Sequence, residues 1–428
     1  MDQWYKVAGI DVHKKMLAVV IANVAELRDG RFERRRFGTE ESALESMAAW
    51  FAAEGVVDVV MESTAQYWKP VWQVLEESFQ LHLAQAQSNR GPKGRKSDFT
   101  DAERLVRRHV AGELILSFVP EPEQRLWRML TRSKRQLSRD RARLRNQIEG
   151  LLEDCRIKLS SHVSDLMGGS GMRMLRAIAE GETDATAIAG LAGGGLRASQ
   201  QVLMESLVRV GSLDPARRQI LQLYVERIEL IDSQMERLAK SCAESLREHQ
   251  DAIRRLASVP GLAADTALQV VAEVGPKAMT FPSPESLASW VGACPGREES
   301  AEVSKSDKSP KGNRTMRRIL NQSAKAAIRS KGSVFQDLYR RLVARIGHPK
   351  AIWAVAHKLC RIIWKILHDG VEYQELGRQP DPKSIERRTG KLVRQLRALG
   401  YQVQLSPSRD AVAAPAKFQG AVIPESAV

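Results

Sequence analysis

Apolar runs near the start of the chain predict a pair of β-strands. Residues 5–20 (YKVAGIDVHKKMLAVV) are mostly apolar up to Asp11, turn polar for a few positions, and become apolar again from Met16. Short β-branched runs bounded by polar turns are typical of strands. The same pattern predicts strands at 56–61 and 81–86 and a helix at 69–78. Strands that alternate with helices indicate an α/β layer domain.

The pattern changes to a helical one after Pro120. Leucines recur every seven residues in an Arg/Lys-rich stretch, at Leu130, Leu137, Leu144 and Leu151. This spacing predicts a coiled-coil-like helix with basic outer faces. A second helix is predicted at 215–248, and glycine-rich, helix-breaking sequence lies between the two. We therefore expect a long helical arm that folds back on itself.

A third unit begins near residue 253. The turn Val259-Pro260-Gly261-Leu262 separates two helical stretches, which is typical of a helix-hairpin-helix whose glycine leaves backbone N–H groups open to a phosphate. A polar, nearly structureless segment is expected at 295–314, followed by helices to about residue 369. The Ala/Pro/Ser-rich tail beyond about residue 405 is expected to be disordered.

Composition and charge narrow the function. The chain has 428 residues, 43% of them hydrophobic, which is enough for two or three folded domains. A net charge of +15 favours a polyanionic partner, most simply nucleic acid. Four scattered cysteines without a CxxC pair argue against a zinc ribbon or a disulfide scaffold. Charges near the N-terminus and the lack of a long apolar run predict a cytoplasmic protein without signal peptide or membrane span.

Four carboxylates stand at positions that suit metal binding. Asp11 interrupts an apolar strand, Glu62 ends another strand, and Asp98 and Asp101 share one face at the start of a predicted helix. Carboxylates that converge repel one another unless a divalent cation lies between them, and hard oxygen ligands suit Mg²⁺. The plain alternative is that each acid is a solvated strand end or helix cap, but burial of an unpaired Asp11 would be costly.

A serine-rich basic segment offers a nucleophile. The stretch PGREESAEVSKSDKSPKGNR contains Ser300, Ser304, Ser306 and Ser309, and from the residues alone none of the four is preferred. A serine hydroxyl can attack a phosphodiester and hold the end as a phosphoserine ester. The cations expected to offset phosphate charge here are Arg297, Lys305, Lys308, Lys311 and Arg314.

A second basic stretch covers residues 90–145, with sixteen Lys and Arg against seven acids. Its cations Lys93, Arg95 and Lys96 precede Asp98 and suit either surface salt bridges or a phosphate track. Such a surface follows a nucleic-acid backbone with little reading of sequence. The alternative is a solvated coiled coil, which the excess of one charge disfavours.

Seven blocks follow one another along the chain: GIDVHKK, MESTAQYWKP, GRKSDFTDAERL, SFVPEPEQRLWRMLTRSKRQL, IKLSS, VPGL and LASWVGACPGREESAEVSKSDKSPKGNRTMRRIL. Together these blocks resemble the DEDD transposases of insertion-sequence family 110. The resemblance covers residues 5–370. It implies an α/β plus α fold: a RuvC-like (RNase-H-like) domain at 1–118, a helical coiled-coil arm at 119–250, a C-terminal transposase domain with a helix-hairpin-helix at 251–375, and a partly disordered tail at 376–428.

The resemblance also implies how the site is used. Asp11, Glu62, Asp98 and Asp101 would be the metal tetrad for Mg²⁺ or Mn²⁺. Ser300 would be the nucleophile, because it stands five residues after Pro295 and before a small residue, although Glu302 replaces an expected glycine. The tetrad of one domain would act together with the serine of another domain or subunit.

The implied partners are donor and target DNA, a structured guide RNA encoded beside the gene, and further copies of the chain in a dimer or tetramer. The implied activity is cutting and rejoining of DNA strands. Two alternatives stay open: a Holliday-junction-type endonuclease that uses the tetrad alone, and a non-catalytic nucleic-acid-binding protein.

Overall fold

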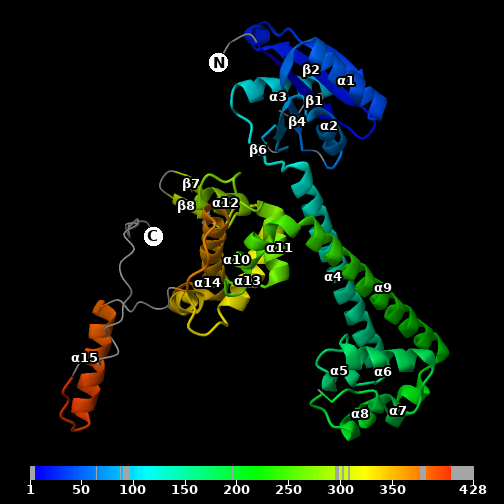
Figure 1. Ribbon diagram of the computed structural model, residues 1–428, viewed down its shortest axis with the longest axis vertical. Helices are drawn as coiled ribbons and strands as arrows, with labels where there is room; N and C mark the ends of the chain where they lie inside the picture. The colour runs from blue at the N-terminus through cyan, green and yellow to red at the C-terminus, as the bar shows by residue number, and fades with distance from the viewer. Residues whose placement is uncertain are drawn as a thin grey trace. The chain divides into compact units, whose positions relative to one another are not determined.

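The protein divides into two compact units, Met1–Arg125 and Leu126–Val428, coloured along the chain in Figure 1. The computed structural model describes residues 5–63, 65–86, 88–89, 97–194, 196–294, 298–300, 303–306, 309–375 and 382–405. Among these residues, no helix is long and apolar enough to cross a membrane. All four cysteines are free thiols.

A mixed six-stranded sheet forms the centre of the first unit, with strand order β3-β2-β1-β4-β5-β6. The strands are β1 Lys6–Val12, β2 Leu17–Asn23, β3 Glu33–Phe37, β4 Val56–Glu62, β5 Gln80–Ala84 and β6 Leu116–Ser117. β1, β4 and β5 are parallel, whereas β2, β3 and β6 join antiparallel. The carboxyl ends of the parallel strands therefore meet at one edge. This mixed sheet is consistent with an RNase-H-like domain.

Helices cover both faces of this sheet. α1 (Glu41–Ala53) and α2 (Trp68–Leu75) pack on the face that presents Ile10 and Val59. α3 (Asp98–Val110) packs on the opposite face through its apolar residues Ala102, Leu105 and Val106. Burying the apolar side of each element against the sheet gives a three-layer domain.

Gly9 lets α3 lie unusually close to β1. A β-carbon at this position would stand 2.5 Å from the carbonyl oxygen of Ala102 and 2.7 Å from a methyl group of Val106. Both distances are shorter than any tolerable contact, so a side chain here would push the helix away. The close approach brings the first turn of α3 toward the end of β1.

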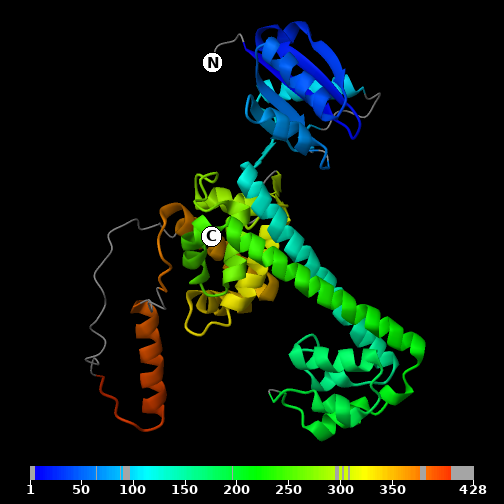
Figure 2. The same cartoon turned by 45° about the vertical axis from the view of Figure 1, so that its right-hand side comes forward.

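Two long helices of the second unit, α4 (Pro122–Asp154) and α9 (Pro215–Ser245), lie side by side in both views (Figures 1 and 2). Leu144 and Ile148 of α4 share a core with Leu221 of α9. Arg141 Nε donates to Asp232 Oδ1 across the pair at 2.6 Å. α4 and α9 therefore pack against each other, while the coiled-coil geometry predicted from the leucine spacing stays a prediction. Leu144 is fully buried, while the flanking leucines of the series are only partly buried.

The glycine-rich stretch between these helices forms short helices separated by turns, and Gly168 and Gly190 stand at helix ends, as the prediction of helix-breaking sequence implies. Four short helices occupy it: α5 Leu159–His162, α6 Gly169–Glu180, α7 Ala185–Gly190 and α8 Gln200–Leu207. Gly171 lies inside α6, where a β-carbon would collide with the backbone of Leu166. Glycine here serves close packing rather than breaking a helix.

The rest of the second unit is mainly helical and surrounds one large core. Its helices are α10 Gln250–Ala257, α11 Ala264–Val274, α12 Pro284–Val291, α13 Arg314–Ala327 and α14 Val334–Asp369. α14 is interrupted at Gly347, whose φ of 77° is not helical. A further helix, α15 (Pro382–Ala398), follows. The tail predicted to be disordered, from residue 406, lies outside the described residues.

The segment 295–314, expected to be nearly structureless, contains a β-hairpin. β7 (Glu298–Ser300) pairs antiparallel with β8 (Val303–Ser306), and Ser300 pairs with Val303 beside the turn. The expectation failed because neither strand has the apolar alternation by which strands are recognised in a sequence.

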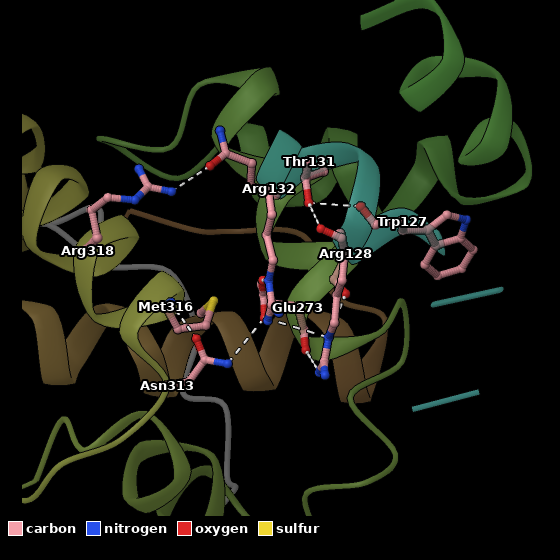
Figure 3. A network of polar contacts seen from close by, with 10 residues as sticks. Trp127, Arg128, Thr131, Arg132, Glu273, Asn313, Met316 and Arg318 are labelled. Atoms are coloured by element: carbon pink, nitrogen blue, oxygen red, sulfur yellow. Dashed lines mark hydrogen bonds and ion pairs between the residues drawn. The ribbon is translucent and has the colours of Figure 1, made fainter. Parts of the chain in front are cut away.

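A buried carboxylate joins α4 to the C-terminal helices (Figure 3). Glu273 on α11 is completely buried and accepts two hydrogen bonds from Arg132, from Nε and Nη2, each at 2.8 Å. Asn313 donates to the same carboxylate at 3.2 Å, and its side-chain oxygen caps α13 by accepting from Met316 N. Arg128 donates to the carbonyl oxygens of Ala272 and Glu273. Burial lowers the pKa of the Arg128 guanidinium to about 10. The network sets the position at which α13 begins.

Candidate active site

Asp11 and Glu62 stand at neighbouring positions on one edge of the first unit's sheet. β1 and β4 are parallel, and the last pair in their register is Ile10 with Met61. The next residues along the two strands are Asp11 and Glu62. Alternation along β1 places Asp11 on the same face as Gly9, which is the face covered by α3.

Asp98 and Asp101 occupy the first turn of α3. Carboxylates are favoured there because the helix dipole is positive at its N-terminus. The three-residue spacing puts both on one side of the helix, as the sequence predicted. Because α3 lies close over Gly9, this turn faces the end of β1.

Three potential ligand groups meet at this point. His13 Nε2 lies 3.1 Å from Asp11 Oδ2 and 3.4 Å from Asp98 Oδ1. One ligand atom from each of Asp11, His13 and Asp98 can be chosen so that all lie within 4.8 Å of one another. The structure therefore brings Asp11 and Asp98 together directly.

Glu62 and Asp101 are connected through two further residues, Asn89 and Arg104. Asn89 is almost completely buried and donates from Nδ2 to Glu62 Oε2 at 2.9 Å. Arg104 donates from Nε to the carbonyl oxygen of Asn89 at 3.1 Å, and its Nη2 contacts the Asp101 carboxylate. Arg104 stands three residues after Asp101 on the same helix, a spacing that could have indicated this pair. Nothing in the sequence indicates that Asn89 would donate a hydrogen bond to Glu62.

The surroundings of Asp11 disfavour its ionised form. Burial raises the pKa of Asp11, and the charges of Asp101 and Asp98 raise it further, against an opposing effect of His13. A divalent cation among these oxygens would remove the repulsion, so the donor set fits a hard metal ion. Among the described residues, Asp11 and Asp98, together with His13, are the groups close enough to share one ion here.

The predicted serine lies in the other unit. Ser300 is the last residue of β7, next to the turn of the hairpin, rather than in an open loop. Lys305 lies on β8, and Lys311 and Arg314 are exposed just before and at the start of α13. Five predicted phosphate-binding residues lie outside the described residues: Lys93, Arg95, Lys96, Arg297 and Lys308.

The basic surface of α4 is partly neutralised within the chain. Its cations contact acids in ion pairs, which are Arg132–Glu273, Lys134–Asp265, Arg141–Asp232, Arg143–Asp140 and Arg145–Glu149. A pocket of about 410 Å³ beside α4 is lined by Lys134, Arg135 and Arg318. Burial lowers the pKa of the Arg318 guanidinium, as does the charge of Arg135. Cations held together in this way suit a phosphate group.

Gly261, at the predicted helix-hairpin-helix turn, borders the same pocket. Its φ of 88° requires glycine, and a β-carbon would collide with the backbone of α13 at Ser323 and Ala327. Packing against α13 therefore explains the glycine at position 261 without any role in phosphate binding.

A mixed sheet with acids at the carboxyl ends of its parallel strands is consistent with a domain of the RNase-H-like class. Two family models match the chain. A DEDD transposase model of the IS110 group, described as transposase, matches residues 8–157, and the transposase IS116/IS110/IS902 family matches residues 253–340. Together they cover more than half of the chain, and it belongs to the IS110 family of DEDD transposases. It is thus a DNA transposase acting by phosphoryl transfer, in a family that typically uses divalent metals. No curated protein gives a significant match.

Proposed function

We propose that the chain cuts and rejoins DNA with a metal site formed by Asp11, Glu62, Asp98 and Asp101. The observation that carries this proposal is the half-buried Asp11, whose pKa is raised by burial and by the neighbouring acids. Mg²⁺, or Mn²⁺, bound there would polarise the phosphodiester and stabilise the departing oxygen. Asn89 and Arg104 hold Glu62 and Asp101 in place, and His13 restrains Asp11 and Asp98.

The second part of the proposal is that Ser300 is the nucleophile. Its hydroxyl oxygen would form a bond to phosphorus as the bond to the departing strand's oxygen breaks. The serine proton passes to solvent or a base, and the departing oxygen takes up a proton. A strand hydroxyl then attacks the phosphoserine ester and releases the serine, which conserves the bond for rejoining. The exposed cations Lys311 and Arg314 support a phosphate near this hairpin.

Because the acids and Ser300 belong to different units, cleavage would require both to meet on the DNA. We propose a homo-oligomer, dimer or tetramer, in which one site is composed from both parts. We further propose that a structured RNA guides the enzyme to donor and target DNA. The net charge of +15 and the basic segments support a nucleic-acid partner, which basic surfaces would hold by its shape.

A covalent-adduct assay tests the serine. Wild-type protein is incubated with DNA, Mg²⁺ and co-purified RNA, denatured, and examined for protein-linked DNA, with mass spectrometry to locate the phosphoserine. We expect the adduct at Ser300, its loss in Ser300→Ala, and its retention in the matched control Ser304→Ala. Cleavage that releases free ends and survives Ser300→Ala would favour the Holliday-junction-type endonuclease. Absence of any metal-dependent cleavage would favour a nucleic-acid-binding protein.

The guide is tested by sequencing the RNA that co-purifies with the protein. We expect one structured species with segments complementary to donor and target DNA. Its removal by RNase should abolish site-specific strand transfer, and its return should restore it. Strand transfer that is unchanged after RNase treatment would rule out the guide.

A further inference from the structure

A second cluster of metal-ligating side chains lies in the first unit, away from the acids described above. It consists of Asp58 on β4, His82 on β5 and His109 in the last turn of α3. One ligand atom from each can be chosen so that all lie within 4.8 Å of one another. His109 is eleven residues from Asp98 along α3, about 16 Å at the helical rise. The two clusters therefore lie at opposite ends of one helix.

The fold brings these residues together through strand register and helix packing. β4 and β5 are parallel, and Val60 pairs with His82, so Asp58 and His82 lie on the same face of the sheet. That face is the one covered by α3, whose last turn carries His109. Each ligand comes from a different element, so a bound ion would join β4, β5 and α3.

The distances suit a small tetrahedral ion. His82 Nε2 lies 3.1 Å from Asp58 Oδ1, and His109 Nε2 lies 3.8 Å from Asp58 Oδ2. Ligands about 2.0–2.2 Å from Zn²⁺ stand roughly 3.3–3.5 Å apart in a tetrahedron. Small side-chain adjustments would therefore place all three atoms on one ion.

The surroundings favour a metal over a simple ion pair. The side chains are mostly but not completely buried, with exposed fractions of 14% for Asp58, 26% for His82 and 13% for His109. Burial lowers the pKa of His109, and the neighbouring His82 lowers it further, against the opposing effect of Asp58. The two rings lie 4.3 Å apart between centroids, so two imidazolium charges would repel each other here.

We propose that Asp58, His82 and His109 bind Zn²⁺, with solvent in the fourth position. Two imidazoles and one carboxylate are a zinc-type donor set, whereas Mg²⁺ prefers oxygen ligands alone. The site would hold the C-terminal end of α3 against β4 and β5. Since the first turn of α3 carries Asp98 and Asp101, zinc would stabilise the helix that supports the acidic site. This proposal does not depend on the proposed roles of Ser300 or the RNA.

The test is calorimetric titration of full-length protein, stripped by a chelator, with Zn²⁺ in the presence of excess Mg²⁺. We expect one tight zinc site in the wild type and at least about a 100-fold loss of affinity in His82→Asn and in His109→Asn, because a first ligand matters no less than its supporting partners. His162→Asn removes an exposed histidine of the second unit and should bind zinc like the wild type. Equal affinity in all three variants would overturn the proposal.

Two further measurements keep the result clear. Asp11→Asn and His13→Asn should retain tight zinc binding, and its loss there instead would assign the zinc to the acidic cluster. If His82→Asn or His109→Asn fails to fold, X-ray absorption of zinc-loaded wild type decides the matter. Two imidazole ligands with Zn–N near 2.0–2.1 Å are expected. Since His13 is the only histidine that the described residues bring to the acidic cluster, a spectrum with one imidazole or none would refute the site.

Discussion

The two ends of α3 hold clusters that differ in their donor atoms. At the N-terminal end, Asp98 lies with Asp11 and the exposed His13. Asp101 is linked to Glu62 through Arg104 and Asn89. At the C-terminal end, a single carboxylate, Asp58, faces two histidines. The first set consists mainly of carboxylate oxygens, while the second set has one carboxylate and two imidazole ligands.

With both proposed sites occupied, one helix would support two ions of different kinds. Oxygen ligands favour Mg²⁺, which keeps waters and accepts a phosphate oxygen, so this end suits chemistry. Two imidazoles and a carboxylate favour Zn²⁺. An ion bound to them would join β4, β5 and α3, so the other end suits stabilisation of the fold. Variants at each end should therefore separate activity from folding.

The largest effect is expected at the acidic end. Asp11→Asn removes a central ligand and should lower metal-dependent DNA cleavage by at least about 100-fold, while zinc binding at the other end persists. Cleavage of labelled DNA across a Mg²⁺ series measures this. The control Asp29→Asn removes an exposed acid of the same unit and should cleave like the wild type. Full activity in Asp11→Asn would contradict the assignment of the metal site.

The acidic end was largely predictable from the sequence, and the histidine end was not. Asp11 stood out because an acid inside an apolar strand is costly, and Asp98 and Asp101 share a helical spacing. Asp58, His82 and His109 are far apart in the sequence and form no motif. Only the strand register and the seating of α3 bring them together.

The same contrast holds for the fold. The apolar β-branched runs predicted β1, β2, β4 and β5, because buried strands have a plain signature. β3 (Glu33–Phe37) was missed because four of its five residues are charged and it lies at the edge of the sheet. The hairpin carrying Ser300 was missed for a related reason, since its residues are mainly polar.

A smaller effect is expected for Arg104, which touches Asp101 and the backbone of Asn89 but no proposed substrate atom. Arg104→Gln should weaken Mg²⁺ binding by about 10–100-fold, as loss of a supporting partner does, and leave zinc affinity unchanged. Titration of cleavage against Mg²⁺ should show recovery at high Mg²⁺. The exposed Arg31 supplies a control, Arg31→Gln. A loss of rate that no Mg²⁺ concentration restores would argue against a positioning role.

Gly9→Ala tests whether both ends depend on how α3 is seated. The added β-carbon would stand 2.5 Å from the carbonyl oxygen of Ala102, so the helix must move. Overpacking of this kind costs about 1–3 kcal/mol, and both Mg²⁺-dependent cleavage and zinc affinity should fall. Urea unfolding measures the stability. Gly150→Ala, where the β-carbon meets open space inside α4, should be neutral or stabilising. A fall at one end only would show that the ends are independent.

The smallest effect concerns metal-free protein at the acidic end. Because the pKa of Asp11 is raised by burial and by Asp101 and Asp98, its ionised form destabilises the fold above that pKa. The folded state binds the proton more tightly than the unfolded state, so this penalty is relieved as the pH falls through the raised pKa. In chelated protein at neutral pH, Asp11→Asn should therefore raise the Tm by about 1–4 °C.

Thermal unfolding of wild type and Asp11→Asn over a pH series tests this sign. The difference in Tm should be greatest at neutral pH and shrink as the pH is lowered, whereas Asp29→Asn should show no such trend. Excess Mg²⁺ should also shrink the difference, because a bound cation stabilises only the wild-type carboxylate. If Asp11→Asn were less stable than the wild type in chelator, the hydrogen bonds of the Asp11 carboxylate would stabilise the metal-free fold. The contrast with the histidine end would then rest on ligand type alone.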